Sequence, residues 1–436
     1  MAKHTFRTTL ATWMAGALMS SMLVCTASAA EPDRGALTID RAVATAVASN
    51  PGLDELRRRA AAAAAIPSQV GTLPDPRLNF GAANLPVDTF ALDQEPMTQL
   101  QIGVTQVFPF PGKLGLRREM AQAEADAAAD SVDEARLRLV RDVRVLWWEL
   151  FYLDRAIETV ERNRSLLRQL VDVARTKYEV GRGLQQDVLL AQVELSRLQD
   201  MALQIDGMRA MSGARFNALL AQPAQTPVPM LRTASSELPE PPDAAELQAL
   251  AERGRPWLSQ LRHQLDAALS AQALARKEYV PDLGVTASYG WRDGNNADRS
   301  ARADFASAMI SISLPLFASR KQDQLVAQRG AERAAREQAL ADARNRVHAD
   351  IAAALADYRR ARDEMALFDD GILPQTAQAV ESMLAGYQVN KVDFLTLVRT
   401  QVTLYNHELQ RWRALSQAQQ ALATLNAAAG KETFDE

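Results

Sequence analysis

The side chains that could catalyse a reaction or bind a metal are few in this chain and lie far apart. No histidine lies at the spacing of a metal ligand from another; the four are His4, His263, His348 and His407. The methionines are scattered and form no soft-metal relay. Gly181-Arg182-Gly183 is too short for a phosphate-binding loop and follows no strand. The sequence therefore predicts no catalytic residues, no metal site, no cofactor and no enzyme activity.

The first 29 residues have the pattern of a secretory signal peptide. Lys3 and Arg7 give a positive start, residues 10–24 form an apolar stretch, and Ala27-Ser28-Ala29 supplies small residues for cleavage. The apolar stretch is shorter than the ~20 residues that a membrane-spanning helix needs. We expect an exported protein from which residues 1–29 are removed.

The single cysteine, Cys25, lies inside this predicted signal peptide. Val24 precedes it, whereas a lipoprotein signal requires a small residue there, so we expect no lipid anchor. The mature chain then has no cysteine for a disulfide or for thiol catalysis. The net charge of −4, with basic residues scattered among acidic ones, gives no reason to expect a nucleic-acid partner.

The chain contains an internal repeat. Tyr178-Glu179-Val180 matches Tyr387-Gln388-Val389, an offset of 387 − 178 = 209 residues. Further matches follow in the same order at offsets of 206 to 209: Pro74-Asp75 with Pro281-Asp282, Phe108-Pro109-Phe110 with Leu314-Pro315-Leu316, Gln192-Val193-Glu194-Leu195 with Gln401-Val402-Thr403-Leu404, and Asn217-Ala218 with Asn426-Ala427. The sequence thus predicts one structural unit written twice.

A proline-rich segment, residues 222–243, separates the two repeats. Proline fixes φ and lacks an amide donor, so we expect an extended linker there. The predicted organisation is a signal peptide (1–29), repeat 1 (30–221), the linker (222–243), repeat 2 (244–430) and a short C-terminal tail (431–436).

Each repeat is predicted to contain a helix, two strands and two very long helices. Residues 113–178 and 184–220 form the long helices of the first repeat, and residues 319–373 and 392–429 those of the second. Gly371 and Pro374 are expected to break the third of these. Two apolar stripes step by three and four residues, as in coiled coils: Val188, Ala191, Leu195, Leu198, Ala202 and Ile205, and Leu395, Val398, Val402, Tyr405, Leu409 and Trp412.

Four segments alternate apolar and small or polar residues, the pattern of half-buried strands. They are residues 78–85, 99–108, 283–291 and 305–314. Segments of about ten residues also suit tilted membrane strands, and a soluble hairpin is an equal alternative from these segments alone. Four strands cannot close a barrel, and open edges are not tolerated in lipid. A membrane form therefore needs strands from several copies.

At Tyr387-Gln388-Val389 and Gln401-Val402-Thr403-Leu404-Tyr405-Asn406 the chain resembles the TolC-like outer-membrane efflux proteins. The first-repeat counterpart is Tyr178-Glu179-Val180-Gly181-Arg182-Gly183 with Asp187-Val188-Leu189. The repeat, the element order and the linker also match, over about residues 37–430. The segment Phe108-Pro109-Phe110-Pro111-Gly112-Lys113 is similar to the cation-efflux, CzcC-type branch.

The resemblance implies a mainly α-helical fold with a β-barrel part. Three copies would form a twelve-stranded outer-membrane barrel, embedded in lipid and continued by a long periplasmic coiled-coil tunnel. The homotrimer would dock on a periplasmic adaptor (membrane fusion protein) and an inner-membrane RND transporter. It would act as a passive exit duct for heavy-metal cations.

The same resemblance places the turns between paired long helices at the periplasmic end, in contact with the adaptor. Glycines suited to tight turns and exposed basic residues agree with this placement, although simple connectors would look alike. The expected tip residues are Val180, Gly181, Arg182, Gly183 and Leu184, and Val389, Asn390, Lys391 and Val392.

A gate is expected beside the second tip. The family commonly has acidic residues where this chain has Thr396 and Arg399, so the usual acidic ring is in doubt. We hypothesise that Asp393 or Asp187 takes part in closure, beside Tyr387 and with Arg399 as a partner; a solvated helix face is an equal alternative.

Other functions remain open from sequence. The duct could carry drugs or other organic compounds, or serve type I secretion. A periplasmic coiled-coil structural protein would be soluble and lack the four strands. An adaptor would carry a lipoyl-like β domain, for which no segment is available.

Overall fold

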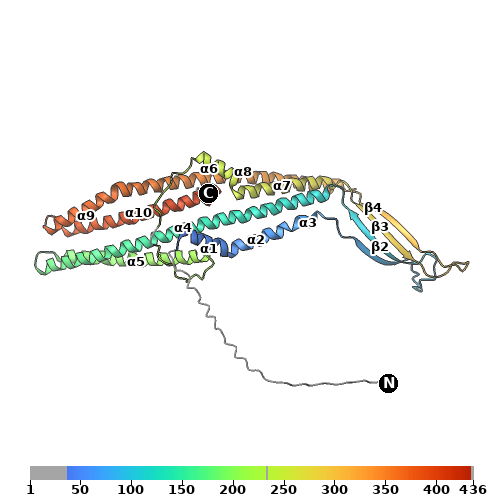
Figure 1. Ribbon diagram of the computed structural model, residues 1–436, viewed down its shortest axis with the longest axis horizontal. Coiled ribbons are helices and arrows are strands. Elements are labelled where there is room, and N and C mark those ends of the chain that lie inside the picture. The colour runs from blue at the N-terminus through green and yellow to red at the C-terminus, as the bar shows by residue number, and fades with distance from the viewer. Residues whose placement is uncertain (1–36, 232–233, 434–436) are drawn as a thin grey trace, which may run out of the picture.

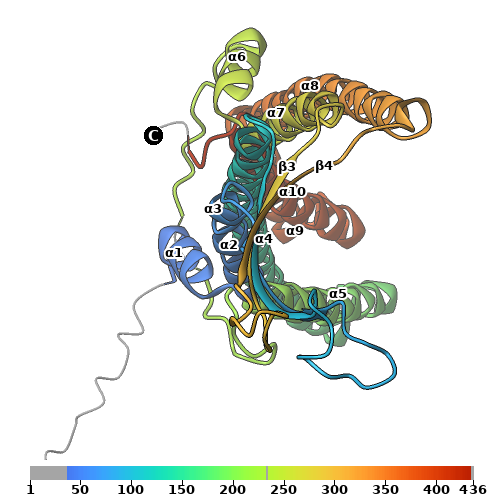
Figure 2. The ribbon, with the colours of Figure 1, turned by 90° about the vertical axis from the view of Figure 1, so that its right-hand side faces the viewer.

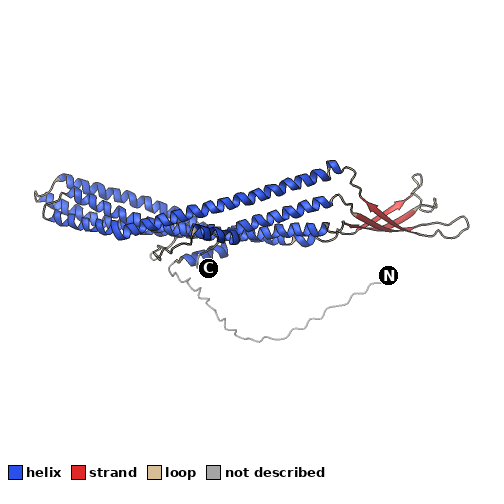
Figure 3. Ribbon diagram, turned by 90° about the horizontal axis from the view of Figure 1, so that it is seen from above, coloured by secondary structure: helices blue, strands red, loops and turns tan. Residues whose placement is uncertain are grey.

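The computed structural model describes residues 37–231 and 234–433, so the predicted signal peptide and Cys25 lie outside the described residues. The molecule is a long rod (Figure 1). A small β-sheet lies at one end, two turns between long helices lie at the other, and helices run between them (Figure 3). None of the helices among these residues is both long and apolar enough to cross a membrane.

The sheet has four antiparallel strands in the order β1-β2-β3-β4. They are β1 (Arg77–Ala83), β2 (Gln99–Phe108), β3 (Leu283–Trp291) and β4 (Phe305–Ile312), within three residues of the predicted bounds. The middle pairing joins the two repeats, with Val104 opposite Ala287 and Ile102 opposite Tyr289. Because side chains alternate along a strand, one face is apolar and the other carries Gly, Ser and Thr.

Short helices precede each hairpin. The first repeat has α1 (Ile39–Ser49), α2 (Pro51–Ala64) and α3 (Ile66–Val70), and the second has α6 (Ala244–Gly254) and α7 (Pro256–Lys277). Their starts follow local chemistry: Thr38 and Asn50 cap α1 and α2 with their side-chain oxygens, and Pro51 and Pro256 occupy first helical positions.

The long helices begin where each hairpin ends. Helix α4 (Lys113–Glu179) has 67 residues, which at 1.5 Å each is ~100 Å. It turns into α5 (Gln185–Leu219), and in the second repeat α8 (Gln322–Leu367) leads through α9 (Leu373–Gln388) to α10 (Phe394–Ala428). A 3₁₀ turn, η1 (Ala318–Arg320), precedes α8.

The predicted break at Gly371 and Pro374 is instead a π-helical turn, η2 (Phe368–Ile372). The Leu373 amide bonds to the Phe368 carbonyl five residues back, so the chain widens by a residue and stays helical. Pro374 has no amide to donate, and this wider turn lets the helix pass the missing bond. Arg411 of α10 holds Asp369 of the turn with two hydrogen bonds, of 2.7 and 3.2 Å.

The helices lie side by side along an arc rather than around a closed centre (Figure 2). In the half nearer the turns, the helices lie next to one another in the order α9, α10, α4 and α5. Nearer the sheet, the order is α2, α4, α7 and α8. The two predicted stripes meet in one apolar cluster, where Val188 and Leu198 of α5 join Val398 and Tyr405 of α10. Trp147 and Trp148 of α4 lie in a large core cluster with Phe151.

The described part of the proline-rich linker, residues 222–231 and 234–243, contains no helix or strand and runs across the middle of the rod (Figure 1). Asp154 of α4, fully buried, accepts a 2.7 Å hydrogen bond from the Leu231 amide and pairs with Arg209 of α5. On the other side, the fully buried Tyr358 of α8 donates a 2.5 Å hydrogen bond to the Pro239 carbonyl. The linker therefore ties both halves of the arc.

Candidate functional site

The two turns at the end of the rod have the same backbone geometry. Gly181 and Asn390 both have positive φ, of 73° and 59°, at equivalent places in the repeat. The amides of Arg182 and Lys391 each bond, at 2.8 Å, to a carbonyl five residues back, which closes a helix with a left-handed residue. The first turn was expected because Gly181 and Gly183 suit a tight turn, and the second because of the family resemblance.

The turns expose apolar and basic side chains together. Val180, Leu184 and Val389 are each about 60% exposed (63%, 59% and 62%). Arg182 and Lys391 are exposed beside them. Of the other predicted tip residues, Gly183 is half-buried against Lys177, and Val392 is half-buried against Gly386. The tips are thus rigid turns with small apolar and cationic surfaces.

Lys177, near the end of α4, fastens the second turn to the first repeat. Its Nζ donates to the Tyr387 carbonyl and to Oδ1 of Asn390, both at 3.1 Å, and lies 3.8 Å from the centre of the Tyr387 ring. An ammonium above an aromatic ring is held by the electron-rich face. Sequence analysis did not single out Lys177, because its partners are 210 and 213 residues away.

Tyr387, a predicted gate residue, is only 7% exposed and packs its ring 5.5 Å from that of Phe394. Burial raises the pKa of its hydroxyl, and the negative charge of Asp187 raises it further. The structure therefore brings together two predicted gate residues, Tyr387 and Asp187, from the two repeats. Lys177 completes the group, which we call the tip latch: Lys177, Asp187, Tyr387 and Asn390.

Asp393 has a different local role. Oδ1 accepts the Thr396 amide and Oδ2 accepts the Thr396 hydroxyl, both at 2.8 Å, so Asp393 caps α10. These hydrogen bonds lower the pKa of the Asp393 carboxyl. Arg399 is exposed, and within the part of the chain that the structure describes no ion pair joins it to Asp393. Within one copy the Asp393 carboxylate is thus engaged in helix capping, and its pairing with Arg399 stays a prediction.

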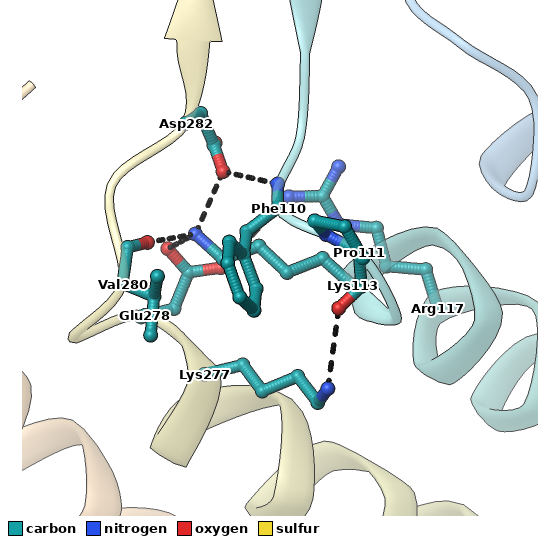
Figure 4. Close-up of polar contacts among 8 residues, drawn as sticks. All are labelled: Phe110, Pro111, Lys113, Arg117, Lys277, Glu278, Val280 and Asp282. Atoms are coloured by element: carbon teal, nitrogen blue, oxygen red, sulfur yellow. Dashed lines mark hydrogen bonds and ion pairs between the residues drawn. The ribbon is translucent and has the colours of Figure 1, made fainter. Parts of the chain in front are cut away.

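A second group of polar residues joins the repeats where the sheet meets the helices (Figure 4). Lys113, the first residue of α4, is 2% exposed. Its Nζ donates to Oδ1 of Asp282 and to the Val280 carbonyl at 2.9 Å, and to Oε2 of Glu278 at 3.4 Å. All three partners belong to the segment between α7 and β3, so this group, called the repeat junction, ties the start of α4 to repeat 2.

The carboxylate of Asp282 also binds the backbone of the first repeat. Its Oδ1 accepts the Phe110 amide at 2.9 Å (Figure 4). Burial favours the neutral acid, but the hydrogen bonds from Lys113 and Phe110 outweigh it, so the pKa of Asp282 falls below its ordinary value. Asp282 is therefore held as an anion that neutralises Lys113.

Gly112 makes this close approach possible. Its φ is +87°, and a Cβ there would lie 2.6 Å from Nζ of Lys277. Lys277 in turn donates to the Pro111 carbonyl at 3.2 Å (Figure 4). The Phe-Pro-Phe-Pro-Gly-Lys segment, noticed in sequence as a branch resemblance, is thus a structural turn that needs its glycine and lysine.

The tip latch and the repeat junction hold parts of the two repeats together, and their geometry suggests no reaction. Among the described residues, no group of three or more His, Cys, Asp and Glu side chains could hold a metal ion. The ion pairs that remain are mostly along helix surfaces, as in Arg175 with Glu179. The tip latch therefore lies at the end of the rod that carries the turns, and the repeat junction lies where the helices meet the sheet.

A four-stranded sheet with free edges, continued by long helices of which α4 spans ~100 Å, is a fold shared with solved outer-membrane channels. The CusC channel shares the fold with a TM-score of 0.78 at 16% identity, covering 90% of this chain and 92% of that one. For VceC of Vibrio cholerae the values are 0.75, 18%, 90% and 96%. For the open state of MtrE of Neisseria gonorrhoeae they are 0.76, 15%, 90% and 89%.

Sequence comparison leads to the same class. Protein CyaE of Bordetella pertussis is 25% identical over 253 residues, 56% of this chain, and the match spans about half (52%) of that relative. The outer membrane efflux protein family matches residues 42–222 and 247–431, and this chain belongs to that family. The predicted resemblance is confirmed, and membership places the chain among outer-membrane transport proteins rather than enzymes.

Proposed function

We propose that three copies of the mature chain form a passive exit duct in the outer membrane. Each copy contributes four strands to a twelve-stranded barrel, and the long helices continue the bore as a periplasmic tunnel. In this proposal transport is driven by another protein, because the described residues offer a path and show no catalytic site.

The observation that supports this most directly is the sheet's pair of free edges. Strands β1 and β4 each have one neighbour, and the face of the sheet that carries Phe80 and Ile310 is apolar and exposed, at 72% and 68%. An apolar face suits lipid, whereas an unpaired edge leaves backbone donors and acceptors without partners there. Closure with sister copies resolves both conditions at once.

The turns at the far end are proposed to contact a periplasmic adaptor, which links the duct to an inner-membrane RND transporter. Val180, Leu184 and Val389 present small apolar surfaces for an interface core. Arg182 and Lys391 supply cations at its rim, which favours an adaptor surface that is apolar with acidic residues around it.

The tip latch is the proposed periplasmic gate. Lys177 of repeat 1 holds Tyr387 and Asn390 of repeat 2 by hydrogen bonds, and the charge of Asp187 acts on the Tyr387 hydroxyl, so the second helical hairpin lies against the first. Releasing these contacts would let α9 and α10 move away from α4. Thr396 and Arg399 lie in α10, the helix that Asp393 caps. In the proposed gate, Asp393 fixes the start of this helix.

The proposed cargo is heavy-metal cations. This rests on the resemblance of residues 108–113 to the cation-efflux branch. Drugs or other organic compounds are the second candidate, since the polar face of the sheet, with Ser288, Ser307 and Thr286, has no chemistry that selects a metal.

A deletion strain tests both levels. Outer-membrane fractions of the complemented strain should contain a heat-sensitive oligomer that conducts ions in planar bilayers. The deletion should raise sensitivity to zinc, cobalt or cadmium salts more than to dyes and detergents. A soluble monomer would refute the duct, whereas a conducting oligomer with sensitivity to organic compounds alone would refute only the metal cargo.

A further inference from the structure

The two β-hairpins of the chain are related by fixed numerical offsets. Pro281 lies 281 − 74 = 207 residues after its match Pro74, and Leu314 lies 314 − 108 = 206 residues after Phe108. Strand pairing is consistent with these values, because it fixes their sum, 207 + 206 = 413. Arg77 pairs with Thr105 in the first hairpin, and Gly284 (77 + 207) pairs with Ser311 (105 + 206) in the second.

The pairing of β2 with β3 then serves as a template for a pairing that a single chain cannot make. Strand β2 is the last strand of repeat 1, and it pairs with β3, the first strand of repeat 2. Strand β4 is likewise the last strand of repeat 2, so the corresponding partner is β1, the first strand of another copy. Adding 206 to a residue number in β2 gives the counterpart in β4, and subtracting 207 from a residue number in β3 gives the counterpart in β1. The observed β2–β3 pairs therefore predict the β4–β1 pairs.

Thr105 opposite Thr286 becomes Ser311 opposite Asn79, and Val104 opposite Ala287 becomes Ile310 opposite Phe80. We propose that β4 of one copy pairs with β1 of the next in this register. The inference rests on the proposed oligomeric duct and adds which residues of the two copies face each other.

The chemistry of the paired residues agrees with the register, although the arithmetic did not use it. Opposite residues in an antiparallel pair lie on the same face of the sheet. Ser311 and Asn79 are both polar, and Ile310 and Phe80 are both apolar. The neighbouring pair, Ile312 and Leu78, is apolar too, each residue being 56% exposed in one copy. A slip by one residue would place Ser311 opposite Phe80 and mix the two faces.

Hydrogen bonds on the polar face point to the same continuation. The Thr105 and Thr286 hydroxyls are 2.9 Å apart, and the amide of Asn79 donates to the Thr105 hydroxyl at 3.0 Å. In the proposed register the hydroxyl of Ser311 comes opposite Asn79, whose amide carries a second N–H donor. The polar ladder would then cross from copy to copy.

Cysteine pairs test the register directly, because the chain has one cysteine, in the predicted signal peptide. The test variant carries Asn79→Cys and Ser311→Cys in the full-length chain, which is exported and purified from outer membranes. Mild oxidation should convert it to covalent dimers and higher oligomers on non-reducing gels, which reduction reverses. Each single variant should give at most one crosslinked species from chance contacts.

Two further variants define the outcome. Phe80→Cys with Ser311→Cys places the thiols on opposite faces, and Gly81→Cys with Ser311→Cys places them on one face two residues apart. Stronger crosslinking by either of these than by the Asn79 pair would overturn the register. Phe80→Cys with Ile310→Cys repeats the test on the apolar face, should the first pair impair assembly.

The same gels separate this inference from the proposed function. Native, heat-sensitive oligomers without crosslinks in the Asn79–Ser311 and Phe80–Ile310 variants would refute the register and leave the duct standing. Variants and unmodified chain that all remain monomeric would refute the duct itself, and the register with it.

Discussion

Nζ of Lys113 lies 2.9 Å from Oδ1 of Asp282, and this ion pair joins the first residue of α4 to the residue before β3. The lysine is almost fully buried, while the side chain of Asp282 is 30% exposed. A buried cation without its anion is strongly destabilising. The pair is therefore a sensitive place to test how the two repeats are held together.

We predict that Asp282→Asn lowers the free energy of unfolding by about 2 kcal/mol, less than for a wholly buried pair because Glu278 remains near the lysine. Thermal dissociation of the purified oligomer, followed by circular dichroism, measures this. Arg117→Met is the control: Arg117 is 3.9 Å from Glu278 and 36% exposed, so its loss should cost at most about 0.5 kcal/mol. Equal effects of the two changes would contradict the assigned role of Asp282.

The same variant should change the response to acid. The pKa of Asp282 in the folded chain is lower than the ordinary 3.8. Its contribution is therefore complete above that pH and is lost as the pH falls through the folded value. The stability difference between the unmodified chain and Asp282→Asn should hold from pH 7 to about pH 4 and shrink on further acidification. A difference that shrinks already at neutral pH would argue against this carboxylate.

Replacing Lys177 with methionine should release the tip latch. The change removes two hydrogen bonds and the ammonium–ring contact, together worth about 2 kcal/mol, so the balance between closed and open states should shift roughly thirtyfold. Single-channel recording should show larger or more frequent openings. Arg175→Met is the matched control, since Arg175 pairs with Glu179 of its own helix and is 71% exposed. Identical recordings for both variants would remove Lys177 from the gate.

Tyr358→Phe tests the fastening of the linker. The hydroxyl of this fully buried residue donates to the Pro239 carbonyl, and its loss should cost about 1–2 kcal/mol of stability. Burial raises the pKa of Tyr358 to about 12. Its contribution is thus complete below pH 10 and is lost as the pH rises from 10 towards 12. Alkaline unfolding curves should converge for the two proteins in that range, and parallel curves would be the contrary result.

The π-turn should be coupled to α10 through Asp369 and Arg411. Their two hydrogen bonds are partly exposed, so a double-mutant cycle of Asp369→Asn and Arg411→Met should give a coupling of about 1 kcal/mol. Unfolding free energies of the two single variants and the double variant measure it. The nearby pair Arg360 and Glu364, within α8, provides a comparison that should couple by only about 0.3–0.5 kcal/mol. Coupling no larger than in that pair would mean that the turn is held by its backbone alone.

The elements were predictable because their signals are local. Alternation placed β2 and β3 at their observed bounds, and the absence of proline between Lys113 and Tyr178 left one helix as the natural outcome. The repeat extended each assignment to the other half, which is why Gly181 and Asn390 were both expected in turns. Such patterns need only neighbours within a few residues.

The contacts that fasten the rod were not predictable in the same way. Lys113 and Lys177 reach partners more than 160 residues away, and periodicity does not say which helices lie beside each other. Asp393 is a different case: its gate role stays a prediction, whereas its capping of α10 had a local signal in the sequence. An aspartate three residues before Thr396, at the start of an apolar periodic segment, is the pattern of a helix cap. Proline at 374 predicted a break, but a π-turn held by Arg411 keeps the helix continuous.

Helix α4 is anchored to repeat 2 near both of its ends, by Lys113 at the sheet and by Lys177 at the turns. Contacts near both ends of α4 prevent repeat 2 from sliding along this helix. In the proposed gate, repeat 2 swings outward at the turns after the contacts of Lys177 are released, while the contacts of Lys113 stay in place. In the proposed duct, opening at the turns therefore need not disturb the strands at the other end of the rod, and the wider π-turn in repeat 2 would accommodate the bend.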